Sequence, residues 1–354
     1  MADQKYTDSD TYQREIAEQY KKRVSKFPVD TVARAIGLLG LKNVKSQDLH
    51  TATVGNVNAT YVGSTIVVKI NDNRNERSYF SNKFISDKLS GHFPIPRALA
   101  YDFFDKTEYE VLVMERAPGT LLLHDIFDLT EKGQITLFEQ VLDVVNGLFS
   151  VTFDHFGQVS DESRTFSTYT ELLKNEFSGY IQIIRAQSLA DERSVSMIEE
   201  YFYERVNIFD SEKPVFIHTD VHMGNILHQG STLTALLDFD SALKAPKIRS
   251  LIPLLGFIHQ PSQFVEGTKD FPKYKGKNFH HLLPTLKKKI PDVFDDRFLL
   301  QKLNLIGIAL GVMWISDNWS TDWNKEMIDT ILSKELASDN NALRHSYHGE
   351  ALAQ

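Results

Sequence analysis

The stretch that decides the fold is residues 215–242, VFIHTDVHMGNILHQGSTLTALLDFDSA. Two short apolar runs, Val215–Ile217 and Leu233–Leu237, flank a polar loop and predict two buried strands. Between the loop and the second run, His228–Ser231 has the glycine and polar residues of a tight turn. Polar side chains therefore stand at the ends of both predicted strands.

The spacing of these polar side chains is the one that phosphoryl transfer requires. A carboxylate must orient the attacking hydroxyl and accept its proton, while an amide oxygen and a second carboxylate hold Mg²⁺ against the phosphates. The kinase pattern His-x-Asp-x-x-x-x-Asn, followed by Asp-Phe-x, matches His218 through Asp240 with its spacing intact. We therefore expect Asp220 to be the catalytic residue, and Asn225 and Asp238 to hold the metal.

Other interpretations exist for the same residues. Asp and Asn in a turn often bend or cap the backbone, and Asp238 could cap a helix. His218 is expected to hold the loop by hydrogen bonds rather than to do chemistry. His218, His222 and His228 together suggest a zinc site, but the chain has no cysteine and the strand pattern argues against a shared helical face. The order and spacing of His218, Asp220, Asn225 and Asp238 together favour the catalytic loop of a kinase.

The quoted segments HTDVHMGNIL and LLDFD resemble the aminoglycoside phosphotransferase and choline kinase-like family. The resemblance runs from about residue 45 to about 335, and it is closer than that to protein kinases because His-x-Asp-x-His-x-x-Asn lacks their arginine before the aspartate. It implies an α+β, two-lobed, protein-kinase-like fold, with an antiparallel-sheet N-lobe (residues 1–117) and a mainly helical C-lobe (residues 118–354). It also implies that the protein uses ATP or GTP together with Mg²⁺, and that His218 and Asp240 support the loop.

The N-terminal third predicts helices followed by a sheet. Apolar residues at helical spacing predict helices at Tyr12–Phe27 and Thr31–Leu39. Runs rich in β-branched residues then predict an antiparallel sheet from the segments Ser46–Thr53, Ala59–Val62 and Thr65–Ile70. The last two strands are expected to be joined at Gly63-Ser64.

Two features of this sheet resemble the family's phosphate-binding groups. Gly55 and Asn58 lie in the loop at residues 53–59, where the family covers the nucleotide phosphates, although the loop by itself reads as an ordinary turn. Lys69 lies inside an apolar strand, where a lysine is costly unless it is paired or bound to an anion. The alternative for Lys69 is an edge-strand lysine that points to solvent.

The expected partner of Lys69 is not where the family has it. In the family a glutamate on the next helix, here Arg77–Leu89, pairs with that lysine. The family's spacing places Asn82 at the position of the glutamate, and Glu76 lies six residues earlier. Either Asn82 makes a neutral hydrogen bond to Lys69, or Glu76 reaches in from the helix start.

The strand predicted at Tyr109–Met114 leads into a segment broken by proline and glycine. This segment resembles the hinge that presents backbone groups to adenine, and the carbonyl of Glu115 and the amide of Ala117 are the positions carried over. A plain linker between lobes is compatible with that interpretation. The boundary between the lobes is expected here.

The rest of the chain is helical in pattern, with helices predicted at Glu131–Ser150, Tyr169–Ala186, Asp191–Asp210 and within Asp296–Ala337. Arg249 stands where the family commonly has an aspartate that supports the catalytic loop. Residues 305–319 resemble the end of hygromycin B phosphotransferase. Three carboxylates near tryptophans could bind a cationic acceptor, namely Asp317, Asp322 and Glu326. The alternative is that the tryptophans are core residues of a helical bundle.

Composition narrows the classes of function. The net charge of −8 without a long basic run makes a nucleic-acid surface improbable, and the absence of cysteine removes disulfides and thiolate ligands. The N-terminus lacks the apolar core of a signal peptide, and no uninterrupted apolar run of about 18 residues is present. We therefore expect a cytoplasmic protein with no membrane partner. The predicted activity is phosphorylation of a small-molecule hydroxyl, aminoglycoside-like in the first instance. The alternatives are a metabolite kinase or a nucleotide-binding pseudokinase.

Overall fold

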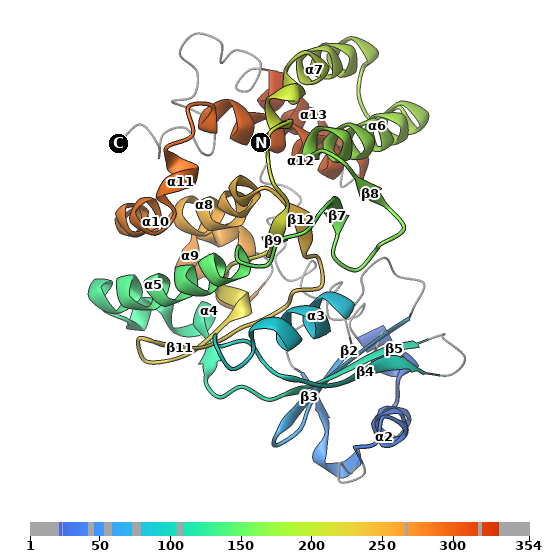
Figure 1. Cartoon of the computed structure of the whole chain (residues 1–354), viewed down its shortest axis with the longest axis vertical. Helices are drawn as coiled ribbons and strands as arrows, with labels where there is room; N and C mark the ends of the chain where they lie inside the picture. Colours follow the sequence, from blue (N-terminus) through green and yellow to red (C-terminus); the bar gives the residue numbers. More distant parts are fainter. Residues whose placement is uncertain are drawn as a thin grey trace.

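The computed structural model describes residues 21–22, 24–41, 46–52, 59–72, 79–104, 109–265, 268–317 and 321–332. Most of the helix predicted at residues 12–27, the loop with Gly55 and Asn58, and Glu76 lie outside these residues. Within them, the molecule has a sheet-based part and a larger helical part, which meet along α3 and α5 (Figure 1).

The smaller part is a five-stranded antiparallel sheet in the order β1-β2-β3-β5-β4. Its strands are β1 (His50–Thr51), β2 (Ala59–Val62), β3 (Ile66–Asp72), β4 (Ala98–Phe104) and β5 (Tyr109–Glu115). One face packs against α2 (Val29–Leu38), which buries Val32, Ala35 and Ile36 against the sheet. The other face carries α3 (Phe80–Leu89), which separates the sheet from the helical part (Figure 1).

The strand predictions were confirmed in the middle of the sheet and failed at its edges. Val62 pairs with Val67 across the turn at Gly63-Ser64, as expected. The predicted strand Ser46–Thr53 is wrong in its first half, because residues Ser46–Asp48 form a 3-10 turn before β1. Polar Ser and Asp residues stabilise such turns locally. β4 was not predicted, and its pairing with β5 shifts register between Ala98 and Ala100.

The two parts are joined by residues 116–119, between β5 and β6 (Thr120–Leu121). β6 belongs to a second sheet in the order β11-β10-β6, with β10 at Ile226–Gln229 and β11 at Thr232–Leu236. Gly119 has φ +108°, and a Cβ there would lie 2.5 Å from the carbonyl oxygen of His228. A glycine is therefore required where the linker enters the larger part.

The larger part is mainly helical. Its longer helices are α5 (Glu131–Leu148), α6 (Tyr169–Gln187), α7 (Glu192–Arg205), α8 (Leu251–His259), α12 (Leu299–Ser316) and α13 (Thr321–Thr330). Shorter ones are α4 (Leu122–Asp125), α9 (Phe271–Tyr274), α10 (Leu283–Lys289) and α11 (Pro291–Phe294). The helices predicted to start at residues 131, 169 and 191 are confirmed, each with a side-chain cap from Thr130, Thr168 or Asp191.

A small antiparallel sheet lies inside this helical part, in the order β8-β7-β12-β9. Its strands are β8 (Thr165–Phe166), β7 (Phe156–Gln158), β12 (Leu243–Ala245) and β9 (Val215–Ile217). β9 is buried throughout, as its apolar sequence predicted. Because β9 enters the segment at residues 218–225 and β12 follows residues 238–242, this sheet positions both ends of the polar segments.

Helix α12 is the core of the helical part. By length and composition it could span a membrane, with a mean hydropathy of 1.5 over residues Leu299–Ser316, yet 67% of that window is buried inside the protein. It packs against α6, and it carries the buried Lys302, which is ion-paired with Asp296 at 2.7 Å. These are the features of a core helix.

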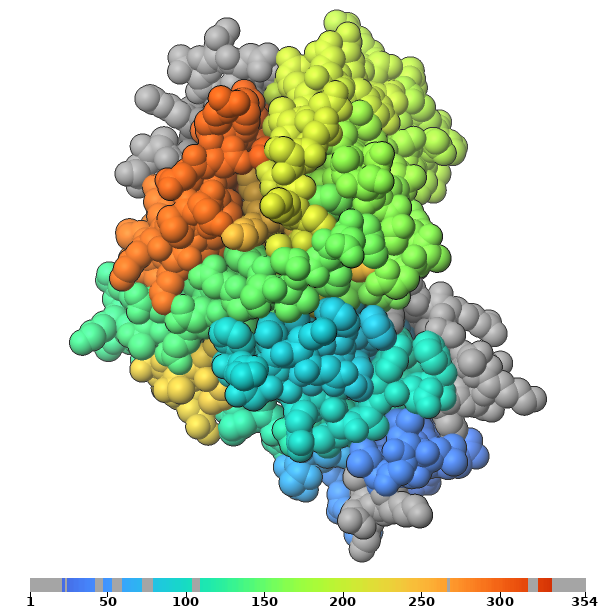
Figure 2. All heavy atoms as spheres, viewed as in Figure 1, coloured from blue at the N-terminus to red at the C-terminus, as the bar shows by residue number. Residues whose placement is uncertain are grey.

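The interface between the two parts is closely packed. Figure 2 shows the cyan atoms around α3 seated directly against the green atoms of α5. Gly147 of α5 allows this approach, because a Cβ there would come within 2.4 Å of the Phe93 ring in the turn after α3. Lys69 of the five-stranded sheet and Asp238 of the helical part meet at this interface.

Candidate active site

Lys69 lies on β3, the central strand of the five-stranded sheet, so it is not an edge-strand lysine. It is 8% exposed, and its Nζ lies 2.7 Å from Asp238 Oδ1 and 3.1 and 3.2 Å from the two oxygens of Asp240. Burial alone would lower the pKa of Lys69, but the charges of Asp238 and Asp240 raise it above its ordinary value. Lys69 is therefore a buried cation shared by two carboxylates.

Asn82 on α3 binds the segment that carries these carboxylates. Its Nδ2 donates to Asp240 Oδ1, and its Oδ1 accepts from the backbone N–H of Phe239 at 3.2 Å. Among the described residues no hydrogen bond joins Asn82 to Lys69, so the first of the two expected arrangements is not observed. In the part of the chain that the structure describes, Lys69 pairs with Asp238 and Asp240, while Glu76 lies outside that part. The sequence signal for Asp240 was the pair of aspartates in Asp-Phe-Asp.

The two carboxylates differ in exposure. The side chain of Asp238 is 41% exposed, and that of Asp240 is 4% exposed. Burial would raise the pKa of Asp238, but the charge of Lys69 lowers it below its ordinary value, whereas burial raises the pKa of Asp240. Asp238 also has φ +66°, a left-handed conformation that aspartate tolerates better than most residues. Asp238 is thus the outward-facing member of the pair and the one with the lower pKa.

His218 follows β9 and forms hydrogen bonds with the backbone of both polar segments. Its Nε2 lies 2.8 Å from the carbonyl oxygen of Leu237, and its Nδ1 accepts from the backbone N–H of Asp220 at 3.2 Å. Burial lowers the pKa of His218, so the ring is neutral, and the Nδ1 acceptor leaves the proton on Nε2. A backbone hydrogen bond of 2.8 Å from Leu237 N–H to Asn225 O ties the two polar segments together.

Asp220 is held by two donors. Asn225 Nδ2 donates to Asp220 Oδ2 at 3.0 Å and to the Asp220 carbonyl at 2.9 Å, and His222 Nε2 lies 3.3 Å from Oδ2. Burial would raise the pKa of Asp220, but the hydrogen bond with His222 lowers it below its ordinary value. The side chain is 52% exposed, and in the described part of the chain Oδ1 has no hydrogen-bond partner. Sequence reasoning missed His222 as a partner, although its place two residues after Asp220 was visible.

The donor set fits Mg²⁺ better than zinc. Mg²⁺ prefers oxygen ligands and is commonly held by one or two protein carboxylates together with phosphate oxygens and water. The amide oxygen of Asn225 and the carboxylate of Asp238 supply such ligands. The three histidines have separate partners: His218 bonds to Leu237, His222 to Asp220, and His228 Nδ1 to the carbonyl of Gly230 at 2.8 Å.

Glu115 and Ala117 lie where the chain passes between the two parts. The side chain of Glu115 pairs with Arg97 Nε at 3.0 Å, and its backbone N–H donates to the Arg97 carbonyl at 2.9 Å. Among the described residues, the N–H of Ala117 has no hydrogen-bond partner. Its position and its free N–H are compatible with the expected hinge role.

Among the described residues, no hydrogen bond or ion pair joins Arg249 to residues 218–240. Arg249 lies in the 3-10 turn Lys247–Ser250. Burial raises the pKa of Glu176 on α6 above its ordinary value, and the charge of Arg249 opposes part of that rise. The support expected from an aspartate at this position comes instead from His218 and from the bond of 2.9 Å between Thr219 Oγ1 and the Ser241 carbonyl.

Of the three carboxylates proposed for the acceptor, the structure describes the side chains of two. Asp317 ends α12 and Glu326 is exposed on α13, and both helices lie beside α6 and α7, at the end of the molecule away from the five-stranded sheet (Figure 1). The side chain of Asp322 lies outside the described residues. Trp314 is 39% exposed, so the core interpretation fails for this tryptophan.

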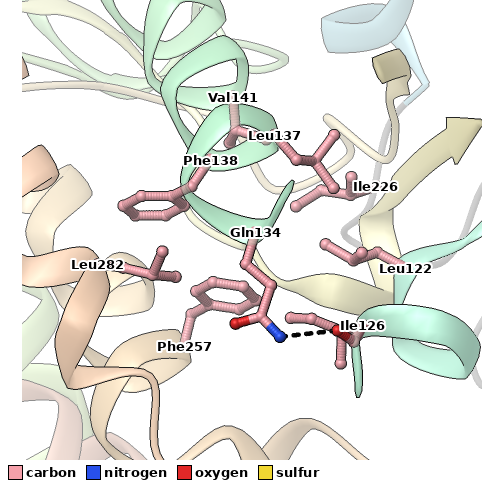
Figure 3. Close-up of a pocket in the computed structure, with 9 residues that line it drawn as sticks. All are labelled: Leu122, Ile126, Gln134, Leu137, Phe138, Val141, Ile226, Phe257 and Leu282. Carbon is pink, nitrogen blue, oxygen red and sulfur yellow. Dashed lines mark hydrogen bonds between the residues drawn. The ribbon is translucent and has the colours of Figure 1, made fainter. Parts of the chain in front are cut away.

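A small cavity lies between α4, α5, β10 and α8 (Figure 3). It has room for about 10 Å³, and apart from Gln134 its lining is apolar. Gln134 Nε2 donates to the carbonyl of Ile126 at 2.8 Å. A space of this size holds at most one water molecule, so it is packing space and not a substrate site.

Comparisons with known proteins identify the family of this chain. A family model described as "Phosphotransferase enzyme family" matches residues 55–260, more than half of the chain. No curated protein sequence matches the chain.

Solved structures of aminoglycoside phosphotransferases match its fold. The ternary complex of an APH(4)-Ia mutant with AMP-PNP and hygromycin B has a TM-score of 0.57 at 16% identity, covering 85% of this chain and 98% of that chain. The streptomycin–ATP complex of APH(2″)-IIa has a TM-score of 0.53 at 15% identity, covering 84% and 95%. The GDP and kanamycin complex of APH(2″)-IIia has a TM-score of 0.51 at 14% identity, covering 86% and 97%.

These matches confirm the family that the segments HTDVHMGNIL and LLDFD indicated and the expected α+β class. At such identities the structural matches speak for the fold alone. The chain belongs to the phosphotransferase enzyme family and has the kinase-like fold of the aminoglycoside phosphotransferases.

Proposed function

We propose that this phosphotransferase moves the γ-phosphoryl group of ATP or GTP to a hydroxyl of a small molecule, with an aminoglycoside-like acceptor favoured. One observation carries the proposal: Lys69 from the sheet and Asp238 from the helical part meet at 2.7 Å, beside the loop that holds Asp220 and Asn225. A cation that can bind phosphate, a base and two metal ligands thus converge where the two parts of the molecule meet.

In this proposal each residue has one role. Asp220 Oδ1 accepts the proton of the acceptor hydroxyl, whose oxygen forms a bond to the γ-phosphorus as the bond from that phosphorus to the leaving nucleoside diphosphate breaks. Asn225 Oδ1 and Asp238 hold Mg²⁺, which neutralises charge on the phosphates when bound. Lys69 exchanges Asp238 for the phosphates and keeps Asp240 as its buried counter-ion.

The remaining nucleotide contacts follow from the position of the linker. The Glu115 carbonyl and the Ala117 amide are assigned to the base, because a backbone donor without a partner at the junction of the two lobes is available to it. Gly55 and Asn58 are assigned to the phosphates by their place in the family's loop. Asn82 acts on the site through Asp240 and not by contact with the nucleotide.

The acceptor assignment rests on the relatives and on charge. The matched structures hold hygromycin B, streptomycin and kanamycin, in company with AMP-PNP, ATP and GDP respectively. A cationic acceptor also suits a chain of net charge −8. Asp317, Asp322 and Glu326 remain proposed acceptor contacts, and they need the acceptor site to extend to α12 and α13.

A turnover screen tests the proposal. Purified protein is incubated with Mg²⁺, with ATP or GTP, and with a panel of aminoglycosides, choline, homoserine and sugars, and release of the nucleoside diphosphate is followed. We expect turnover with at least one aminoglycoside, and turnover about 10²- to 10⁴-fold slower with Asp220→Asn. A better kcat/KM with choline, homoserine or a sugar would make the chain a metabolite kinase. Nucleotide-dependent stabilisation without turnover on any acceptor would make it a pseudokinase.

A further inference from the structure

We propose that His222 is the positioning residue for the base of this reaction: its Nε2–H holds Asp220 Oδ2 so that Oδ1 alone faces the acceptor hydroxyl. The inference rests on the proposed phosphotransfer by this site. It is carried by the contacts on the two sides of the imidazole ring, which together decide the ring's tautomer and orientation.

The tautomer of His222 is set by the backbone. The N–H of Gly224 donates to His222 Nδ1 at 3.0 Å. A ring nitrogen that accepts a hydrogen bond carries no proton, so in the neutral ring the proton is on Nε2. Nε2 is the atom that lies 3.3 Å from Asp220 Oδ2. His222 is therefore a donor to the carboxylate.

The orientation of His222 is set by packing. Its ring stacks on Phe264, with centroids 4.6 Å apart and planes at 9°. Phe264 ends the 3-10 turn η6 (Pro261–Phe264), which follows α8, and it packs on Gly256, where a Cβ would come within 3.2 Å of its ring. On the other side, a Cβ on Gly224 would lie 2.7 Å from His222 Cε1. The ring is thus held in place without help from Asp220.

A second donor shows why His222 is needed. Asn225 Nδ2 also donates to Asp220 Oδ2, at 3.0 Å, and lies 3.2 Å from His222 Nε2. The two donors converge on one oxygen and leave the other free. Without His222, Asn225 would have to orient Asp220 alone, while its amide oxygen is also the proposed Mg²⁺ ligand.

Three substitutions of His222 separate its contacts. His222→Gln places an amide N–H where Nε2 stands and keeps the donor to Asp220. His222→Asn places an acceptor where Nδ1 stands and keeps only the bond from Gly224. His222→Phe keeps only the stack on Phe264. The loss of a hydrogen bond to a charged group predicts that kcat falls about 10- to 100-fold in the Asn and Phe variants.

The expected order of kcat is wild type, then Gln, then Asn and Phe, with nucleotide affinity by calorimetry unchanged throughout. His92→Phe is the matched control, since His92 is exposed in the turn after α3, and it should keep wild-type kcat. If the Asn variant equals or exceeds the Gln variant, His222 acts only by packing through Gly224, and the inference fails.

A measurement without turnover separates this inference from the proposed function. Nitrogen-15 NMR of labelled histidine in the nucleotide-free protein reports which ring nitrogen of His222 carries the proton, with His222→Gln identifying the signal. A proton on Nε2 supports the inference, and a neutral ring with its proton on Nδ1 overturns it. If wild-type protein shows no turnover on the whole panel, the proposed function fails, while the tautomer result still stands.

Discussion

Exchanging the amide and the carboxylate at positions 82 and 240 tests which residue balances the buried charge of Lys69. Asn and Asp have nearly the same shape, so Asn82→Asp with Asp240→Asn moves one negative charge across a single hydrogen bond without changing the packing. In the structure Asn82 donates to Asp240, and Asp240 contacts Lys69 through both oxygens. We expect the double variant to be more stable than its two single substitutions together predict.

The magnitudes follow from burial. Asp240→Asn leaves Lys69 with Asp238 as its one carboxylate and removes a charged hydrogen bond, which costs about 1.5–3 kcal/mol. Asn82→Asp sets two carboxylates against each other at positions less than a tenth exposed, and breaking a buried charge arrangement in this way costs about 3–5 kcal/mol. In the double variant one donor again faces one carboxylate, so a coupling of about 2 kcal/mol between the two changes is expected.

The assay is urea-induced unfolding of the four proteins in the absence of nucleotide, followed by circular dichroism. A second pair provides the control: Asn82→Asp combined with Asp191→Ala, which removes the side-chain cap of α7 in the other part of the molecule and should be additive. The reasoning is refuted if the exchange at 82 and 240 is also additive. Nucleotide affinity measured on the same proteins then tests the proposed role of Lys69 separately.

Three further predictions concern the loop and its surroundings. Asp220→Asn should lower kcat about 10²- to 10⁴-fold with nucleotide affinity retained. Asp238→Asn should lower both kcat and nucleotide affinity, and added Mg²⁺ should restore part of each. Wild-type turnover in Asp220→Asn would contradict the assignment. Lys69→Ala should weaken ATP binding in calorimetry and also lower the free energy of unfolding, because it leaves Asp238 and Asp240 without their shared cation; unchanged affinity would count against a phosphate role. Burial would raise the pKa of Asp270, but Lys273 and His124 lower it below its ordinary value. The ionised carboxylate therefore stabilises the fold at pH values above the pKa that it has in the unfolded state, and this contribution is lost as pH falls below about 4. The stability difference between wild type and Asp270→Asn should therefore shrink in acid unfolding experiments, and a constant difference from pH 7 to pH 2 would refute this sign.

The local structure of the polar loop could be predicted from sequence because one continuous segment supplies it. β9, the loop, the hairpin β10–β11 and Asp238 follow one another within residues 215–238, so their spacing alone constrains their geometry. The turn at Gly230, with φ +58°, and the buried strand Val215–Ile217 were visible for the same reason. Local turn chemistry and apolar periodicity act within a few residues, and they are read directly from the chain.

The partner of Lys69 could not be predicted in this way. Lys69 is 169 residues from Asp238 and 171 from Asp240, and Asn82 is 158 residues from Asp240. The sequence offered Asn82 or Glu76 because both are near Lys69 along the chain. Among the described residues, the packing of α3 between the sheet and the helical part brings Asp240 to Lys69.

The setting of His222 was decided by the tertiary structure as well. The sequence placed this histidine two residues after Asp220, but its stacking partner Phe264 comes from a turn that no sequence pattern marked. A single chain determines which residue types stand near each other in sequence, and hence the chemistry that a loop can perform. Which buried charge is balanced by which partner is decided only when distant segments pack, because desolvation makes an unpaired charge costly and leaves few arrangements that satisfy every group.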